Sequence, residues 1–343
     1  MFTMEAIVRH RMLLMSVAGA GAAIGFTWLV LSLRKKKRKL RKVGEVTQLI
    51  VYPIKSCKGV PLPEAECSVH GLRNGLLRDR HWAVSNEEKT VVSARHEPRL
   101  VLINSSSDQG FLTLSAPEME DLKVPLTHPS TNEVVTSRVL GHLVQGRDCG
   151  DEASHWITAA LRSRHVYRLL QFEDRMKHRN PKDEYVLYTE NDKVAYPELS
   201  PLHVLSEAAV EDLNSRLEEK VTFRNFRPNI LISGCGAYEE DSWEEIQIGR
   251  DVTLKRVMPS IRCLFTTVDP DTGIPHAKNE PLKTLRRCLG SGHTLLCPSS
   301  TPVTESFFCP RKLLPPVPDR IKEAVQVQPP VWPVLPSNKE RRP

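Results

Sequence analysis

The 343-residue chain lacks the short motifs that mark several common classes of enzyme. No G-x-G-x-x-G segment follows an expected strand, so the sequence does not indicate a nicotinamide or flavin site. No C-x-x-C pair occurs among the eight cysteines, which argues against a structural zinc site or a dithiol redox motif. The histidines His81, His96 and His155 form no metal-ligand pattern either, and we expect them to be structural or surface residues.

The chain also lacks the broad basic surface that nucleic-acid-binding domains carry. Its formal net charge is +7, but residues 34–42 hold eight Lys and Arg side chains and no acidic one. Subtracting these eight charges from +7 leaves −1 for the remainder of the chain. The body is therefore nearly neutral, which argues against a nucleic-acid reader.

The basic run follows an uncharged stretch at residues 13–33. As a helix these residues would be about 30 Å long, enough to cross a hydrocarbon core. The positive flank on the C-terminal side predicts that the body lies in the cytosol. Residues 1–42 are thus interpreted as a single-pass signal anchor with a transmembrane helix at 13–33. Its moderate hydrophobicity and basic flanks suit the mitochondrial outer membrane, with the endoplasmic reticulum or peroxisomal membrane as alternatives.

Short strands dominate the rest of the chain. Period-two alternation and flanking turn residues predict strands at 43–52, 81–85, 100–104, 111–114, 167–172, 230–233, 246–248, 252–257 and 264–268. Apolar residues at helical spacing predict a helix at 152–162, and Ser206 is suited to N-cap a second helix. Trp82, Trp156 and Trp243 are expected in the core. The pattern predicts an α+β chain built around a β-barrel.

Residues 296–343 differ in composition from the rest. Eleven of these 48 residues are proline, and they show no helical or alternating apolar period. This composition predicts a disordered or polyproline-like tail.

The most informative segment is 259–273, in which Cys263 follows Arg262 and precedes an acidic turn. A thiolate binds redox metals directly, and an adjacent guanidinium would favour the thiolate form. The alternative is a buried structural cysteine before a turn.

This segment resembles the molybdenum-ligand segment of the MOSC superfamily, and in particular its vertebrate branch, the mitochondrial amidoxime-reducing components. Further segments match that family in the same order: Val51–Gly59, Gly71–Arg80, Ser93–Arg99, Gly146–Gly150, Leu213–Arg216, Asn225–Asn229 and Asp241–Glu245. The resemblance covers about residues 43–288. It implies an N-terminal β-barrel-like domain at 43–172 and a MOSC domain at 173–295, which the different C-terminal segment would leave incomplete.

The resemblance also implies the residues of a molybdenum-cofactor (Mo-molybdopterin) site. Cys263 would be the protein ligand of the metal, and Glu198 stands where the family has an acidic residue near the metal that could relay protons. The cofactor-binding positions would be Lys55, Ser56, Arg80, Ser200, Arg227, Asn229, Ser260 and Arg262. Arg95 and Arg99 are interpreted instead as an internal ion-pair network around Glu97.

The implied activity is a molybdenum-dependent oxidoreductase of nitrate and N-hydroxy compound metabolism. It would reduce amidoximes and hydroxylamines to amidines and amines, with electrons passed from NADH by cytochrome b5 reductase and cytochrome b5. One alternative is a catalytically impaired, membrane-tethered binding protein. Another is a sulfur-transfer protein, as elsewhere in the superfamily. Pyridoxal phosphate binding is implied only at the level of the superfamily.

Overall fold

The computed structural model describes residues 40–180, 193–289, 302–308, 312–314 and 324–327. The predicted transmembrane helix at 13–33 and most of the basic run lie outside these residues. Among the residues described, no helix is both long and apolar enough to span a bilayer. The chain divides at Leu40, and the unit that begins at Arg41 contains all the elements below.

The largest sheet has eight strands and draws on residues from 41 to 327. Its order is β14 (Ile230–Ser233), β13 (Leu202–Ser206), β17 (Pro302–Phe308), β16 (Val252–Ile261), β15 (Glu245–Ile248), β19 (Ala324–Val327), β1 (Arg41–Val51) and β2 (Val60–Leu62). β1 also pairs with β14, at the far end of this order. Among the strand pairs described in this sheet, β13–β14 alone is parallel, so the sheet is mixed.

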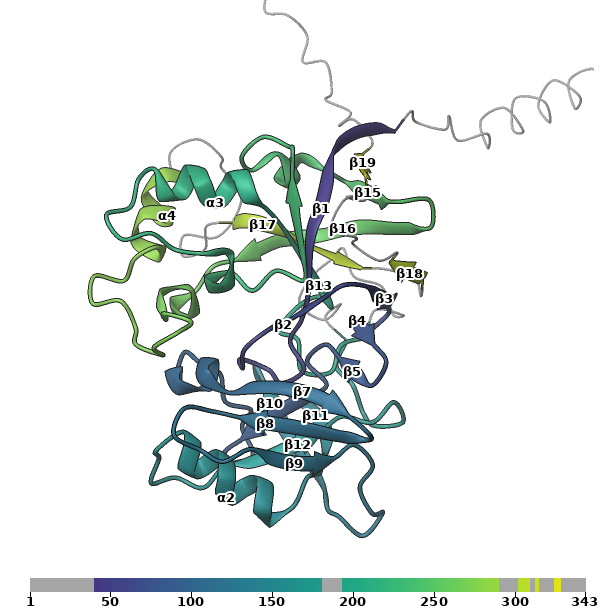
Figure 1. The fold of residues 1–343 in the computed structure, drawn as a ribbon, viewed down its shortest axis with the longest axis vertical. Helices are drawn as coiled ribbons and strands as arrows, with labels where there is room; N and C mark the ends of the chain where they lie inside the picture. The colour runs from purple at the N-terminus through teal and green to yellow at the C-terminus, as the bar shows by residue number, and fades with distance from the viewer. Residues whose placement is uncertain (1–39, 181–192, 290–301, 309–311, 315–323, 328–343) are drawn as a thin grey trace, which may run out of the picture. The chain divides into compact units, whose positions relative to one another are not determined.

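Three smaller sheets complete the strands described. One has the order β10 (Val134–Val139), β11 (His142–Asp148), β12 (Arg168–Gln171) and β6 (Trp82–Ser85). A second has the order β18 (Lys312–Leu314), β3 (Ala65–Ser68), β4 (Gly71–Asn74) and β5 (Leu77–Arg78). The third has the order β7 (Asn104–Asp108), β8 (Phe111–Ser115) and β9 (Leu122–Pro125). In Figure 1, α2 (Asp151–Ala160) lies beside β9 and β12. Helix α3 (Glu207–Asn214) lies beside β13 and β14, and α4 (Leu282–Leu289) lies beside β17.

Strand β1 joins the two largest hydrophobic cores. Val43, Val46 and Leu49 pack into the core of the eight-stranded sheet, together with strands β13 to β16. Val51 belongs to the other core, which includes residues of α2 and of strands β8 and β9. Because one strand supplies both cores, the turn that follows it is held between them, and that turn carries two of the predicted site residues.

Both predicted helices and seven of the nine predicted strands are confirmed, whereas helix α4 and several strands, among them β10, β11 and β13, were not predicted. Helix α2 falls within two residues of the predicted range, and the Ser206 side chain accepts a hydrogen bond from the backbone N–H of Ala209 at 3.1 Å as the N-cap of α3. Trp82 and Trp243 are buried as expected, whereas Trp156 is only half-buried.

Two predicted strands are wrong. Residues 98–102 and 264–267 form the 3-10 helices η1 (Pro98–Leu102) and η5 (Leu264–Thr267). In η5 the hydroxyls of Thr266 and Thr267 donate to the carbonyls of Cys263 and Leu264 at 2.9 and 2.7 Å. Such bonds from a side chain to the preceding backbone stabilise a tight turn over an extended strand, which is why the β-branched threonines misled the prediction. In η1, Pro98 stands in the first turn, where its fixed φ favours a helical start.

The prediction of an unpacked C-terminal segment is also wrong for three stretches of it. β17 pairs with both β13 and β16, β19 pairs with both β1 and β15, and β18 pairs with β3. The strands avoid the proline clusters, since only Pro302, at the first position of β17, is a proline. Proline content averaged over 48 residues concealed these short proline-poor runs.

Candidate functional site

One cavity of about 160 Å³ brings together residues from distant parts of the chain. All ten site residues predicted from the sequence line it: Lys55, Ser56, Arg80, Glu198, Ser200, Arg227, Asn229, Ser260, Arg262 and Cys263. They lie in the turn after β1, in the loops before β6, β13 and β14, and at the end of β16. Loops at strand ends are where a rigid scaffold places binding groups, so the location supports a site.

Three of these residues hold left-handed backbone conformations. The φ angles are +68° at Ser56, +46° at Arg80 and +58° at Arg227. This region is costly for residues other than glycine and persists only where the surroundings determine it. Each of the three therefore projects its side chain from a strained turn, as is common in ligand-binding sites.

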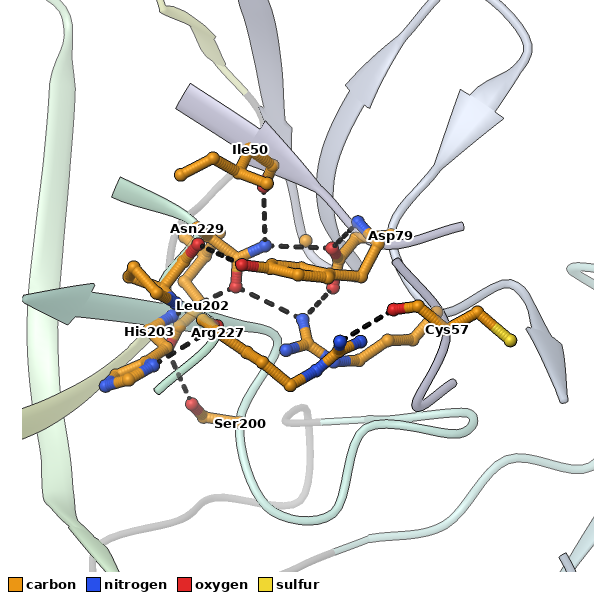
Figure 2. Close-up of polar contacts among 12 residues, drawn as sticks. Ile50, Cys57, Asp79, Ser200, Leu202, His203, Arg227 and Asn229 are labelled. Atoms are coloured by element: carbon orange, nitrogen blue, oxygen red, sulfur yellow. Dashed lines mark hydrogen bonds and ion pairs between the residues drawn. The ribbon is translucent and has the colours of Figure 1, made fainter. Parts of the chain in front are cut away.

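Asn229 is the centre of a buried polar network, which Figure 2 shows. Its Nδ2 donates to the carbonyl of Ile50 at 3.0 Å and to Oδ1 of Asp79 at 2.8 Å. Its Oδ1 accepts from Arg80 Nη1 and from the His203 backbone N–H, both at 3.2 Å. Arg80 also forms an ion pair with the buried carboxylate of Asp79. Asn229 thus has a structural part in the site, because it fixes Arg80 against two strands.

Arg227 lies between two aromatic rings. Its guanidinium carbon is 4.1 Å from the ring centroid of Tyr52 and 5.1 Å from that of Phe265. Its Nη1 donates to the carbonyl of Cys57 at 2.6 Å, as Figure 2 shows, while its buried Nη2 has no hydrogen-bond partner among the residues described. Burial lowers the pKa of Arg227 to about 10. An unsatisfied buried donor on a cation is costly unless an acceptor from outside the protein meets it.

Arg262 is held in the cavity wall by His203, a residue that the sequence did not single out. Arg262 Nη2 lies 3.0 Å from His203 Nε2, and His203 Nδ1 lies 3.3 Å from the carbonyl of Arg227. A guanidinium only donates and a carbonyl only accepts, so Nε2 accepts and Nδ1 carries the proton. Burial and the neighbouring Arg262 keep the pKa of His203 well below its ordinary value, which agrees with a neutral ring.

The thiol lies at another side of the cavity, next to Arg95. Arg95 Nη1 donates to Cys263 Sγ at 3.6 Å, and its Nη2 donates to Glu198 Oε1 at 2.5 Å. Lys55 Nζ is 3.6 Å from the same Glu198 oxygen. Although burial alone would raise the pKa of Glu198, Lys55 and Arg95 together lower it, so the carboxylate is ionised at neutral pH. Burial lowers the pKa of Lys55 to about 8.

The interpretation of Arg95 and Arg99 as a shared ion-pair network is wrong. Arg95 contacts Glu198 and Cys263, whereas Arg99 Nε donates to the carbonyl of Ala160 at 3.3 Å. The contacts of Arg95 could not be predicted from its neighbours in the sequence, because Glu198 and Cys263 lie more than a hundred positions away. Asp79 was missed for the same reason, although its place next to Arg80 in a matched segment offered a hint.

The residues of the cavity fit a ligand that carries an anionic group and binds a thiolate. Four lining side chains are cations (Lys55, Arg80, Arg227 and Arg262), against one carboxylate. Buried nitrogens of Arg227 and Arg262 lack a partner among the described residues. Phosphate oxygens are strong acceptors for such donors, and a cysteine held by an arginine is suited to bind a soft metal. The donor set therefore matches a phosphorylated, thiolate-ligated cofactor.

Comparison with known families accounts for most of the chain. Residues 43–164 match the MOSC N-terminal beta barrel domain and residues 191–296 match the MOSC domain. The chain is 54% identical over 252 residues to the mitochondrial amidoxime-reducing component 1 of Mus musculus, covering 74% of this chain and 73% of the relative. It is also 54% identical to the human component 1, over 74% of each chain, and 46% identical to component 2 of Rattus norvegicus, over 81% of this chain and 82% of that one. The chain thus belongs to the MOSC-domain family of mitochondrial amidoxime-reducing components.

Proposed function

We propose that the chain is a molybdenum-cofactor reductase that converts N-hydroxylated compounds, such as amidoximes and hydroxylamines, to amidines and amines. The observation that carries this proposal is the meeting of ten predicted residues around one cationic cavity with a thiol in its wall. Relatives named amidoxime-reducing components, which match about three quarters of the chain, support the same activity.

The chain's own residues would hold the cofactor in two ways. Arg227 Nη2 and Arg262 Nε, which lack partners among the described residues, would donate to the phosphate, with Lys55 and Arg80 adding positive charge. Ser56, Ser200, Ser260 and the neighbouring backbone would add donors for the pterin. Cys263 would ligate the metal, with its Sγ oriented by the hydrogen bond from Arg95. When bound, the cofactor supplies the two electrons that cleave the N–O bond.

The reaction also consumes two protons, because R–NH–OH, two electrons and two protons give R–NH2 and water. Glu198 is ionised in this structure, so it is suited to accept a proton first. Lys55, 3.6 Å from Glu198 and with its pKa lowered to about 8, is protonated at neutral pH and close to its titration point. The Lys55–Glu198 pair therefore forms a short route by which protons reach the thiol side of the cavity.

The electrons would come from other proteins. The sequence has no flavin or nicotinamide motif, and in the family's scheme NADH-cytochrome b5 reductase and cytochrome b5 supply the electrons. Residues 13–33 would anchor the chain in the mitochondrial outer membrane with the body in the cytosol. A shared membrane would raise the local concentration of these partners.

The pairing of β1 with β14 supports a barrel-type closure of the eight-stranded sheet in this body.

Molybdenum content and activity of the purified protein test the proposal. The parent should contain molybdenum and reduce an aryl amidoxime with a chemical electron donor. Cys263→Ala should abolish reduction while most of the pterin stays bound, since the phosphate contacts come from other residues. Cys235→Ala, which removes a half-buried thiol outside the cavity, is the matched control and should leave both unchanged. A parent without molybdenum would favour the alternative of a binding protein.

A further inference from the structure

A second cavity lies against the thiol side of the site. Its volume is about 300 Å³, and it shares Lys55 and Glu198 with the first cavity. Arg95, which donates to Cys263 Sγ, is also in its wall. The remaining lining residues come from the segment after β6 and from the β10–β11 hairpin: Thr90, Val91, Ser93, His96, Arg138, Val139, Leu140 and Gly141. This cavity thus adjoins the thiol side of the first cavity at Lys55, Arg95 and Glu198.

The hairpin presents an apolar side chain at the rim of this cavity. Leu140 and Gly141 form the two-residue connection between β10 and β11, with φ angles of +50° and +85°. A two-residue turn with both φ angles positive favours asparagine or glycine at the first position, and a bulky residue there is strained. Leu140 is nevertheless 48% exposed, so it contributes little to the core. Neither the turn nor the core explains a leucine at this position.

The chemistry of the lining selects one class of ligand. Val91, Val139 and Leu140 offer apolar surface, while Lys55, Arg95 and Arg138 carry positive charge. Glu198, the lining carboxylate, is already engaged by Arg95 and Lys55. Amidoximes and hydroxylamines are weak bases and are neutral at pH 7, whereas the amidines and alkylamines formed from them are cations. The cavity therefore favours the neutral N-hydroxylated compound over its cationic reduced product.

We propose that this second cavity receives the organic group of the N-hydroxylated substrate, with Leu140 as a specificity-determining residue. This inference rests on the proposed function. The substrate's N–O group would point to the thiol side, past Arg95 and Glu198, and its aryl or alkyl group would lie against Val91, Val139 and Leu140. Compounds with a large apolar group would benefit from Leu140, and hydroxylamine itself would not.

The test compares Leu140→Asn with the parent on two substrates. Asparagine tolerates the left-handed conformation, so the variant should fold with an unchanged or higher melting temperature. In the cofactor-loaded full-length protein, the ratio of kcat/KM for an aryl amidoxime to that for hydroxylamine should fall about tenfold, mainly through KM. The matched control is Leu143→Asn, which alters a leucine of the same hairpin that is 41% exposed and does not line the cavity. Its ratio should equal that of the parent.

A binding measurement provides a second readout that does not require turnover. An aryl carboxamide is neutral, similar in shape to the aryl amidoxime, and has no N–O bond. Calorimetry should show weaker carboxamide binding to Leu140→Asn than to the parent and to Leu143→Asn. If Leu140→Asn changed neither the ratio nor carboxamide binding, the inference would be refuted while the proposed function stood. A loaded parent that reduced neither substrate would refute the proposed function itself.

Discussion

Replacing Asn229 with alanine should destabilise the body of the protein and disturb the anion-binding side of the cavity at the same time. The Asn229 side chain is fully buried and makes four hydrogen bonds, two as donor and two as acceptor. They reach strand β1, Asp79, Arg80 and the backbone of His203. Alanine would leave the carbonyl of Ile50 and the N–H of His203 without these partners, and Arg80 would keep only Asp79 from this network.

The expected size follows from these four bonds. A buried hydrogen bond contributes about 1 kcal/mol net, and a buried group left without a partner costs about 1–3 kcal/mol. Asn229→Ala should therefore lower the free energy of unfolding by about 3–5 kcal/mol. For a protein of this size, each kcal/mol of lost stability lowers the melting temperature by about 2–4 °C, so the melting temperature should fall by roughly 6–20 °C.

Urea unfolding followed by circular dichroism measures the loss, and the pterin released from purified protein measures retention of the cofactor. Asn74→Ala is the matched control, because Asn74 is only half-buried and its side chain makes one hydrogen bond, at 3.0 Å, to the carbonyl of Glu64. It should lower the free energy of unfolding by no more than about 1 kcal/mol, the net contribution of one hydrogen bond. A loss below about 1 kcal/mol in Asn229→Ala, together with full pterin content, would refute the role assigned to this network.

Three further predictions concern Lys55 and the two ends of the chain. Burial lowers the pKa of Lys55 from 10.5 to about 8. Between pH 8 and 10.5 the unfolded chain therefore binds more protons at Lys55 than the folded protein does, so the free energy of unfolding rises with pH across this range. In urea titrations, the free energy of unfolding of the parent should rise by up to about 3 kcal/mol more than that of Lys55→Met between pH 8 and 10.5. If the two proteins showed the same dependence on pH, this prediction would be wrong. Deleting residues 1–40, where the folded unit begins, should give a protein in the soluble fraction that still reduces an amidoxime with an artificial donor; retention by membranes would argue for another membrane element. Deleting residues 302–343 should abolish cooperative unfolding because it removes β17 and β19 from inside the large sheet, whereas deleting 328–343 removes none of the described strands and should not. Equal unfolding curves for the two deletions would refute the importance of these strands.

The sequence predicted which residues meet in one cavity better than it predicted the strands. The resemblance assigns residues segment by segment and does not depend on how the strands are ordered. Ten positions could therefore be assigned to one cavity without knowledge of the topology. The contacts between Arg95 and Cys263, and between His203 and Arg262, could not be predicted, because they join positions far apart in the chain. Strand prediction failed at Leu264–Thr267, where threonine hydroxyls bond to the preceding backbone and close a 3-10 turn. It also failed at β17 and β19, whose partners lie up to nearly three hundred residues away.

The pairing of β1 with β14 and β19 has a consequence for how the protein is made. Strand β1 begins at residue 41, while β19, which lies between β1 and β15, ends at residue 327. A ribosome releases the N-terminal strand long before its partner exists, and contacts between distant residues form slowly. The edge of β1 must therefore stay unpaired through most of synthesis, and the edge of β15 from about residue 248 until β19 is made, and exposed strand edges invite aggregation. The domain of residues 43–164, by contrast, has most of its partners within reach as soon as it emerges, so we expect it to fold first and to keep β1 in place until the last strands arrive.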